Sequence, residues 1–369
     1  MNSARVTHSA SRTEKVYQKF IDVVDRVPQQ RGFANPRLEH GLELQACRIM
    51  GVGAYLPAKI LTNAQIGRQL ADDGEWIFSR TGIRERRIAD DDEFTSDLAT
   101  RASLNALSNA GLKAEDVELI IVATNTPDMA FPATACLVQA KIGAPKCPAI
   151  DLKAGGAGFI YALEVGRRFI VSRAVETVLV IGAEKLSSVI DWGDRNTCAL
   201  FGDGAGAVVL RRVPSGTGVI ATYLGSNGTG GDLLTISGGG SRIPASIDSV
   251  AHGLHFLRMQ GAQTFKAAVT ALCEAANEAL RQSCIKLGEI DCIIPHQSNG
   301  RIIETFARRL RVQPGQLFLN LEHCGNTSAA SIPIALAEAI ELGRIKSGDF
   351  VLLVGFGSGL TSGASVIQW

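Results

Sequence analysis

The sequence predicts a layered α/β fold, because short apolar runs punctuated by glycine alternate with amphipathic segments from Cys47 onward. The chain has 369 residues, of which 46% are hydrophobic, so it can bury a large core in one large domain or two fused ones. The apolar runs are continuous and not alternating, which is typical of strands covered by helices on both faces. Together these observations predict sheets enclosed between helical layers.

The first 45 residues stand apart from this pattern. Apolar residues repeat at helical spacing from Val16 to Val27, and proline and glycine interrupt the chain after them. We expect an N-terminal extension over 1–45, whose short helix docks on the body or on a partner subunit. The body is expected to form two halves, 46–215 and 216–369, that each run through strands and helices to a glycine-rich final strand.

Within the body, the strands and helices follow from the apolar patterns. Continuous apolar runs predict strands over 119–124, 177–181, 207–210, 292–294 and 350–354. Apolar residues at helical spacing predict helices over 97–109, 157–171, 264–283, 301–310 and 329–342.

Charge and cysteine content exclude several classes of function. Lys and Arg total 37 and Asp and Glu total 36, so no global field attracts nucleic acid or an anionic membrane. The eight cysteines form no C-x-x-C pair, which is typical of reduced thiols in a cytoplasmic protein. No apolar run reaches about 20 residues, so we expect neither a membrane span nor an export signal.

Three polar segments carry candidate chemistry. His296 follows the expected strand 292–294 and precedes a helix, a junction where open α/β sheets place catalytic side chains, although a structural histidine is an equally good interpretation. Asn326 precedes an alanine-rich helix, where it could also be an N-cap. The glycine-rich turn around Ser358 follows the last apolar strand and leaves backbone N–H groups approachable, as an oxyanion site requires.

Four separate segments resemble the signature segments of the β-ketoacyl-acyl-carrier-protein synthase III family, in the same order and at similar spacing. They are EWIFSRTGIRERR at 75–87, FGDGAGA at 201–207, PHQSNGRII at 295–303 and GNTSAAS at 325–331. The resemblance extends from Cys47 to Trp369. It implies a thiolase-like αβαβα five-layer sandwich of two similar βαβαβαββ halves, in a homodimer that acts in fatty-acid or related biosynthesis.

The resemblance also implies a catalytic Cys, His and Asn, of which the last two correspond to His296 and Asn326. In that family, cysteine accepts an acyl group from acyl-CoA. The other two residues then hold malonyl-acyl-carrier protein during decarboxylation and condensation, without a cofactor. The cysteine position falls in DLKAGGAGF (151–159) on Gly156, so the usual covalent route is impossible for this sequence.

Several alternatives for the missing nucleophile remain open. The glycine could be an engineered or acquired change in an ordinary condensing site. The protein could instead be a malonyl decarboxylase or direct acyltransferase that uses His296 and Asn326, or a catalytically silent homologue that binds carrier protein. Cys324 as a replacement nucleophile is a remote alternative.

The resemblance assigns further residues to binding, each with a plainer structural alternative such as core packing for Trp76 or a solvated charge for an arginine. The CoA and pantetheine contacts are Trp76, Arg80, Arg195 and Asn299. The acyl-carrier-protein contacts are Lys266, Arg301, Arg308 and Arg309. The backbone N–H groups of Gly156 and Ser358 are expected to bind the oxyanion.

Overall fold

The computed structural model describes residues 45–214 and 217–369, which belong to one compact unit. The expected extension lies almost entirely outside the described residues, as does the expected boundary between the two halves at 215–216. Among the described residues, no helix is both long and apolar enough to cross a membrane.

The N-terminal sheet has five strands in the order β1-β7-β6-β4-β5. Strand β4 pairs in parallel with β5 and β6, whereas β7 pairs antiparallel with β6 and β1. Helices α4 and α5 pack on one face through a core of alanine, valine, leucine and isoleucine. The bounds are β1 Gln45–Tyr55, β4 Leu119–Ala123, β5 Ala149–Leu152, β6 Thr177–Glu184, β7 Gly204–Pro214, α4 Thr95–Ala110 and α5 Thr134–Ile142.

The C-terminal sheet repeats this plan with one strand fewer, in the order β11-β12-β13-β8. Where the resemblance implies a fifth strand, Leu317 forms only an isolated parallel bridge to Ile293 of β11. Helices α8 and α9 cover the outer face. The bounds are β8 Gly218–Gly225, β11 Cys292–Pro295, β12 Phe350–Gly357, β13 Thr361–Gln368, α8 Gly261–Ser283 and α9 Gly300–Leu310.

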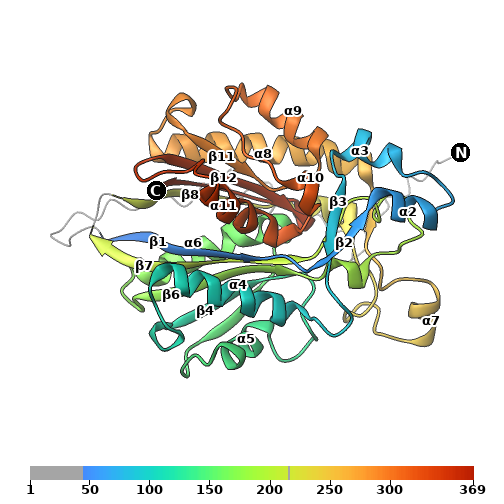
Figure 1. Ribbon diagram of the computed structural model, residues 1–369, viewed down its shortest axis with the longest axis horizontal. Coiled ribbons are helices and arrows are strands. Elements are labelled where there is room, and N and C mark those ends of the chain that lie inside the picture. Colours follow the sequence, from blue (N-terminus) through green and yellow to red (C-terminus); the bar gives the residue numbers. More distant parts are fainter. Residues whose placement is uncertain (1–44, 215–216) are drawn as a thin grey trace, which may run out of the picture. The chain divides into compact units, whose positions relative to one another are not determined.

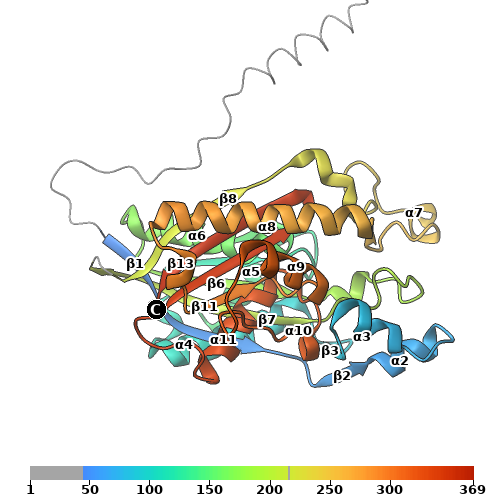
Figure 2. The ribbon, with the colours of Figure 1, turned by 90° about the horizontal axis from the view of Figure 1, so that it is seen from above.

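Two helices, α6 (Gly158–Val171) and α11 (Ser331–Glu341), form the middle layer between the sheets. Their apolar side chains belong to one core cluster with residues from both sheets. Figure 1 shows the order of the layers, with α4 and α5 on one outside and α8 and α9 on the other, and Figure 2 looks down on α8 from above. The expected five-layer sandwich is confirmed, and all five expected strands and all five expected helices are present.

Shorter elements connect the main strands and helices. In the N-terminal half they are β2 Lys59–Thr62, α2 Asn63–Gln69, α3 Glu75–Thr81, β3 Glu85–Ile88, and the 3-10 turns Ala114–Asp116, Gly155–Ala157 and Leu186–Val189. In the C-terminal half they are β9 Leu234–Thr235, α7 Ile247–Ala251, β10 Arg258–Met259, α10 Leu321–Cys324, and the 3-10 turns Gly228–Leu233, Leu287–Glu289, Ser328–Ala330 and Ser358–Leu360.

Strand β1 shows why apolar patterns alone did not mark every strand. Gly51 and Gly53 interrupt its apolar run, and glycine ordinarily weakens a strand. A Cβ atom at Gly53 would lie 2.3 Å from the backbone nitrogen of Ala106 in α4, and one at Gly51 would lie 2.3 Å from the Ala106 carbonyl oxygen. The glycines therefore allow α4 to rest directly on the strand backbone.

Candidate active site

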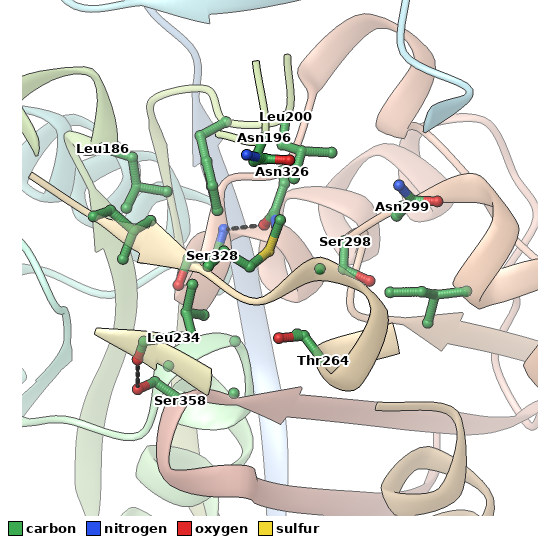
Figure 3. A pocket seen from close by; sticks show the side chains of 18 of the residues that line it. Leu186, Asn196, Leu200, Leu234, Thr264, Ser298, Asn299, Asn326, Ser328 and Ser358 are labelled. Carbon is green, nitrogen blue, oxygen red and sulfur yellow. Dashed lines mark hydrogen bonds between the residues drawn. The ribbon is translucent and has the colours of Figure 1, made fainter. Parts of the chain in front are cut away.

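A cavity of about 470 Å³ lies where the two halves meet. Its walls come from the glycine turn before α6, the β11–α9 junction, the loop after α10 and the turn after β12. Figure 3 shows Asn326, Ser328, Ser298, Thr264 and Ser358 around it. The cavity thus joins the segments that the sequence singled out separately.

His296 lies directly after β11, as expected, and the residue is 3% exposed. Its Nδ1 atom lies 2.6 Å from Ser331 Oγ, which also accepts the Gln297 N–H at 3.3 Å. Directing the serine hydroxyl hydrogen at Nδ1 satisfies both groups, so we assign the ring hydrogen to Nε2. Burial lowers the pKa of His296 to about 3, which keeps the ring neutral.

Asn326 follows α10, and hydrogen bonds of its own backbone hold it in place. Its N–H donates to the Leu200 carbonyl at 2.9 Å, and its carbonyl accepts the Gly202 N–H at 3.1 Å. Its side-chain Oδ1 accepts the Ser328 N–H at 2.9 Å in a local turn (Figure 3). The N-cap alternative is wrong, because Thr327 caps the 3-10 turn and Ala330 caps α11. Because Oδ1 is engaged, the amide NH₂ is the part of the side chain that remains to donate to a ligand.

Gly156 lies in the 3-10 turn that leads into α6 and borders the same cavity. A Cβ atom there would lie 2.3 Å from His296 Nε2 and 2.6 Å from the Phe356 carbonyl oxygen. Neighbouring Gly155 has φ +54°, and a Cβ on it would lie 2.5 Å from Ser358 N. The imidazole therefore occupies the space that a side chain at position 156 would need.

No cysteine is found among the residues that line the described cavity. Cys324, two residues before Asn326, is 2% exposed and packs against Ala330 and Ile334. The remote alternative of Cys324 as a replacement nucleophile is thus wrong for this arrangement, because its sulfur lies in a separate cluster.

The expected CoA contacts meet at the rim of the cavity. The guanidinium carbons of Arg80 and Arg195 lie 5.7 and 5.6 Å from the centre of the Trp76 ring. Arg195 is fixed by an ion pair of 2.8 Å with Asp72. Asn299 also lines the cavity, and its Oδ1 caps α9 by accepting the Arg301 N–H at 2.9 Å.

Comparisons with known proteins agree with this arrangement. The family model described as 3-oxoacyl-[acyl-carrier-protein (ACP)] synthase III matches residues 150–228, and the model of its C-terminal part matches 280–369. The β-ketoacyl-[acyl-carrier-protein] synthase III of Caldanaerobacter subterraneus subsp. tengcongensis is 52% identical over 324 residues, covering 88% of this chain and 98% of that protein. This chain belongs to the β-ketoacyl-[acyl-carrier-protein] synthase III family.

Solved structures of synthase III enzymes have the same fold. The enzyme from Aquifex aeolicus matches with a TM-score of 0.81 and 44% identity, over 88% of this chain and 100% of that one. The enzyme from Thermus thermophilus matches with a TM-score of 0.82 and 44% identity, over 87% and 99% of the two chains.

The four basic residues expected to contact a carrier protein lie on the outer helices of this synthase III fold. Lys266 is exposed on α8, and Arg301, Arg308 and Arg309 are exposed on α9. The Arg301 guanidinium donates to the Ser79 carbonyl at 2.9 Å, which ties α9 to α3 beside Trp76. Lys266 and Arg301 are each next in sequence to a cavity-lining residue, whereas Arg308 and Arg309 lie in the last turn of α9.

Sequence reasoning missed the residues that hold the synthase III site in shape. Ser331 was part of the GNTSAAS segment but received no role, although serine at a helix start commonly makes local hydrogen bonds. Glu184, at the end of β6, is fully buried and accepts hydrogen bonds from Asn125 and Thr126 at 2.6 to 3.1 Å. Burial raises the pKa of Glu184. Asn125 and Thr126 line the cavity, so this carboxyl group fixes one wall.

Proposed function

We propose that this synthase III family member decarboxylates a malonyl thioester carried by acyl carrier protein, with His296 and Asn326 as the catalytic residues and no covalent acyl-enzyme. The observation that carries the proposal is that two neutral hydrogen-bond donors, His296 Nε2–H and the Asn326 amide, face one cavity beside a glycine.

The chemistry follows from these donors. When the bond between the malonyl carboxylate and the α-carbon breaks, CO₂ leaves and its electron pair forms a thioester enolate, whose negative charge lies on the carbonyl oxygen. Two neutral donors fixed at that oxygen stabilise the enolate more than the ground-state carbonyl, which lowers the barrier. The α-carbon then takes a proton from water, and the product is an acetyl thioester.

Gly156 is the reason to propose decarboxylation in place of condensation through an acyl-enzyme. The position has no atom that could carry an acyl group, and no cysteine lines the described cavity. The close approach of His296 Nε2 to the position of a Cβ at residue 156, 2.3 Å, supports a site that works with glycine there. The backbone N–H groups of Gly156 and Ser358 remain available as secondary oxyanion donors.

The residues at the rim of the cavity support the proposal that the substrate is carried by acyl carrier protein or CoA. Trp76 with its two flanking arginines offers a flat aromatic face and two positive charges, which suit an adenine nucleotide and its phosphates. The exposed bases on α8 and α9 suit an acidic carrier protein whose pantetheine arm enters past Asn299. We propose acyl carrier protein and CoA thioesters as the two ligands of this rim.

The proposed assembly is a homodimer built on β5. This strand is the edge of the N-terminal sheet, so its outer backbone groups are available to a second copy. Phe131, 89% exposed, and Ile150, 40% exposed, add apolar surface on and near that edge. Light scattering should report a dimer that Ile150→Asp dissociates. Ile247→Asp, at an isoleucine that is 90% exposed on α7, is the matched control.

The decisive experiment supplies malonyl-acyl-carrier protein and measures CO₂ release and acetyl-carrier protein. Wild type should turn over, His296→Ala should not, and intact mass after acyl-CoA treatment should show no adduct. Saturable carrier binding without CO₂ release, unchanged in His296→Ala, would instead identify a silent carrier-binding homologue. An acyl adduct on wild type would refute the non-covalent route.

A further inference from the structure

A second group of reactive side chains lies outside the cavity, where α10 meets α11 (Figure 1). His323 and Cys324 end α10, and Glu338 lies in the last turns of α11. One nitrogen, one sulfur and one carboxylate oxygen from these residues lie within 4.8 Å of one another. Across residues 45–214 and 217–369, this is the one cluster of three such side chains at that spacing.

We propose that His323, Cys324 and Glu338 form a zinc-binding site. The donor set of imidazole, thiolate and carboxylate is one that Zn²⁺ favours, whereas calcium and magnesium prefer oxygen alone. The cluster is therefore chemically unlike an ordinary surface group of acids.

The distances fit a tetrahedral ion after small side-chain rotations. Zinc bonds of about 2.3 Å to sulfur and about 2.0–2.2 Å to nitrogen and oxygen place the donors roughly 3.3 to 3.7 Å apart. His323 Nε2 already lies 3.2 Å from the Glu338 carboxylate. All three donor atoms already lie within 4.8 Å of one another, so only small side-chain rotations are needed to close the site.

The surroundings supply both support and access. Asn320 donates to Glu338 Oε2 at 2.8 Å, which fixes the carboxylate as partners of metal ligands commonly do. The Cys324 side chain is held from the interior by Ala330 and Ile334. The His323 and Glu338 side chains are 44% and 28% exposed, so an ion can enter from solvent and keep a water as its fourth ligand.

Bound zinc would join α10 to α11 two residues before Asn326. The backbone of that asparagine is otherwise positioned by its contacts with Leu200 and Gly202. The proposed ion would fasten the loop that carries Asn326, and it lies outside the cavity.

The test uses the full chain, stripped with chelator and dialysed. Calorimetry with Zn²⁺ should give one site per chain. Replacing Zn²⁺ with Co²⁺ should give a thiolate-to-cobalt charge-transfer band in the near ultraviolet. Cys324→Ser should remove the band and weaken Zn²⁺ binding by more than the ~10- to 100-fold typical of losing an outer-shell partner. Cys284→Ser, at an exposed cysteine outside the cluster, should change neither result.

Two surface substitutions keep the test valid if Cys324→Ser does not fold. His323→Ala and Glu338→Gln should each weaken Zn²⁺ binding, and glutamine keeps an oxygen for Asn320. Absence of stoichiometric Zn²⁺ binding by wild type would overturn the proposal. Binding that all three cluster substitutions leave unchanged would also overturn it, because the ion would then be bound elsewhere.

Discussion

The two helices of the middle layer begin in the same way but present different chemistry. Each is preceded by a 3-10 turn whose first residue has a left-handed backbone, Gly155 at φ +54° before α6 and Ser328 at φ +47° before α11. At α6 the turn presents only backbone, and its glycines pack against the turn after β12. At α11, Asn326 before the turn accepts the Ser328 N–H of the turn, and Ser331 at the start of the helix bonds to His296.

This difference teaches that two helix starts of similar backbone shape can present different chemical groups to one cavity. The N-terminal helix start keeps its approach to His296 and to the glycine-rich turn, but it contributes only N–H groups. The side chains to which we assign the proposed chemistry, His296 and Asn326, instead come from the C-terminal half. We therefore expect substitutions at the start of α11 to lower kcat. Substitutions at the start of α6 should instead lower the free energy of unfolding by disturbing the packing.

The strongest test of the comparison is Asn326→Asp. Aspartate keeps the oxygen that accepts the Ser328 N–H but removes the donor and adds negative charge toward the enolate. We expect kcat for malonyl decarboxylation to fall by ~10²- to 10³-fold, as for loss of an oxyanion donor. Asn227→Asp is the control, because Asn227 accepts the Thr229 N–H in the same way outside the cavity. Unchanged turnover in Asn326→Asp would remove Asn326 from the mechanism.

The next test is Gly156→Ala, which adds a Cβ where His296 Nε2 and the Phe356 carbonyl lie. Overpacking of this kind costs about 1–3 kcal/mol in the free energy of unfolding. Urea unfolding measures the loss, and Gly288→Ala, at an exposed glycine with open space around it, should change little. If Gly156→Ala is as stable as wild type, the N-terminal helix start is not closed to side chains. An acylated Gly156→Cys would lead to the same conclusion.

The pH dependence of the free energy of unfolding tests whether His296 is neutral in the folded protein. His296 has its pKa lowered from 6.5 to about 3 by burial. Below pH 6.5 the unfolded chain binds a proton at this residue and the folded chain does not, so stability falls as the pH decreases toward 3. The slope from this group alone is about 1.4 kcal/mol per pH unit. His296→Gln should remove this part of the pH dependence in urea unfolding between pH 7 and pH 5. Identical slopes would mean that the ring is protonated in the fold.

The smallest expected effect comes from Ser331→Ala, which removes the partner of His296 Nδ1. The loss of one hydrogen bond, about 0.5–1.5 kcal/mol, should lower kcat by roughly 2- to 12-fold while KM stays the same. Ser365→Ala removes another buried serine hydroxyl, away from His296, and should leave kcat unchanged. If Ser331→Ala lowers only the fraction of folded protein, and kcat per folded molecule stays the same, Ser331 has a purely structural role.

The sequence alone determined the main elements and the candidate residues. The continuous apolar runs that became β4, β6, β11 and β12 marked buried strands, because a strand covered on both faces must be apolar throughout. His296 could be placed at the end of such a strand because its polar neighbours break the run abruptly. The glycine at position 156 could be read directly, since it depended only on the local DLKAGGAGF segment.

Only the tertiary structure decided which of these residues meet and how they are held. The hydrogen bond from Ser331 to His296 and the ion pair of Asp72 with Arg195 join residues 35 and more than 100 positions apart. The single bridge at Leu317 in place of a fifth strand likewise depends on its neighbour β11. Apolar periodicity reports which side of an element is buried but not which element covers it. The packing of both sheets on α6 and α11 decides that, and it also places the His296 ring over Gly156.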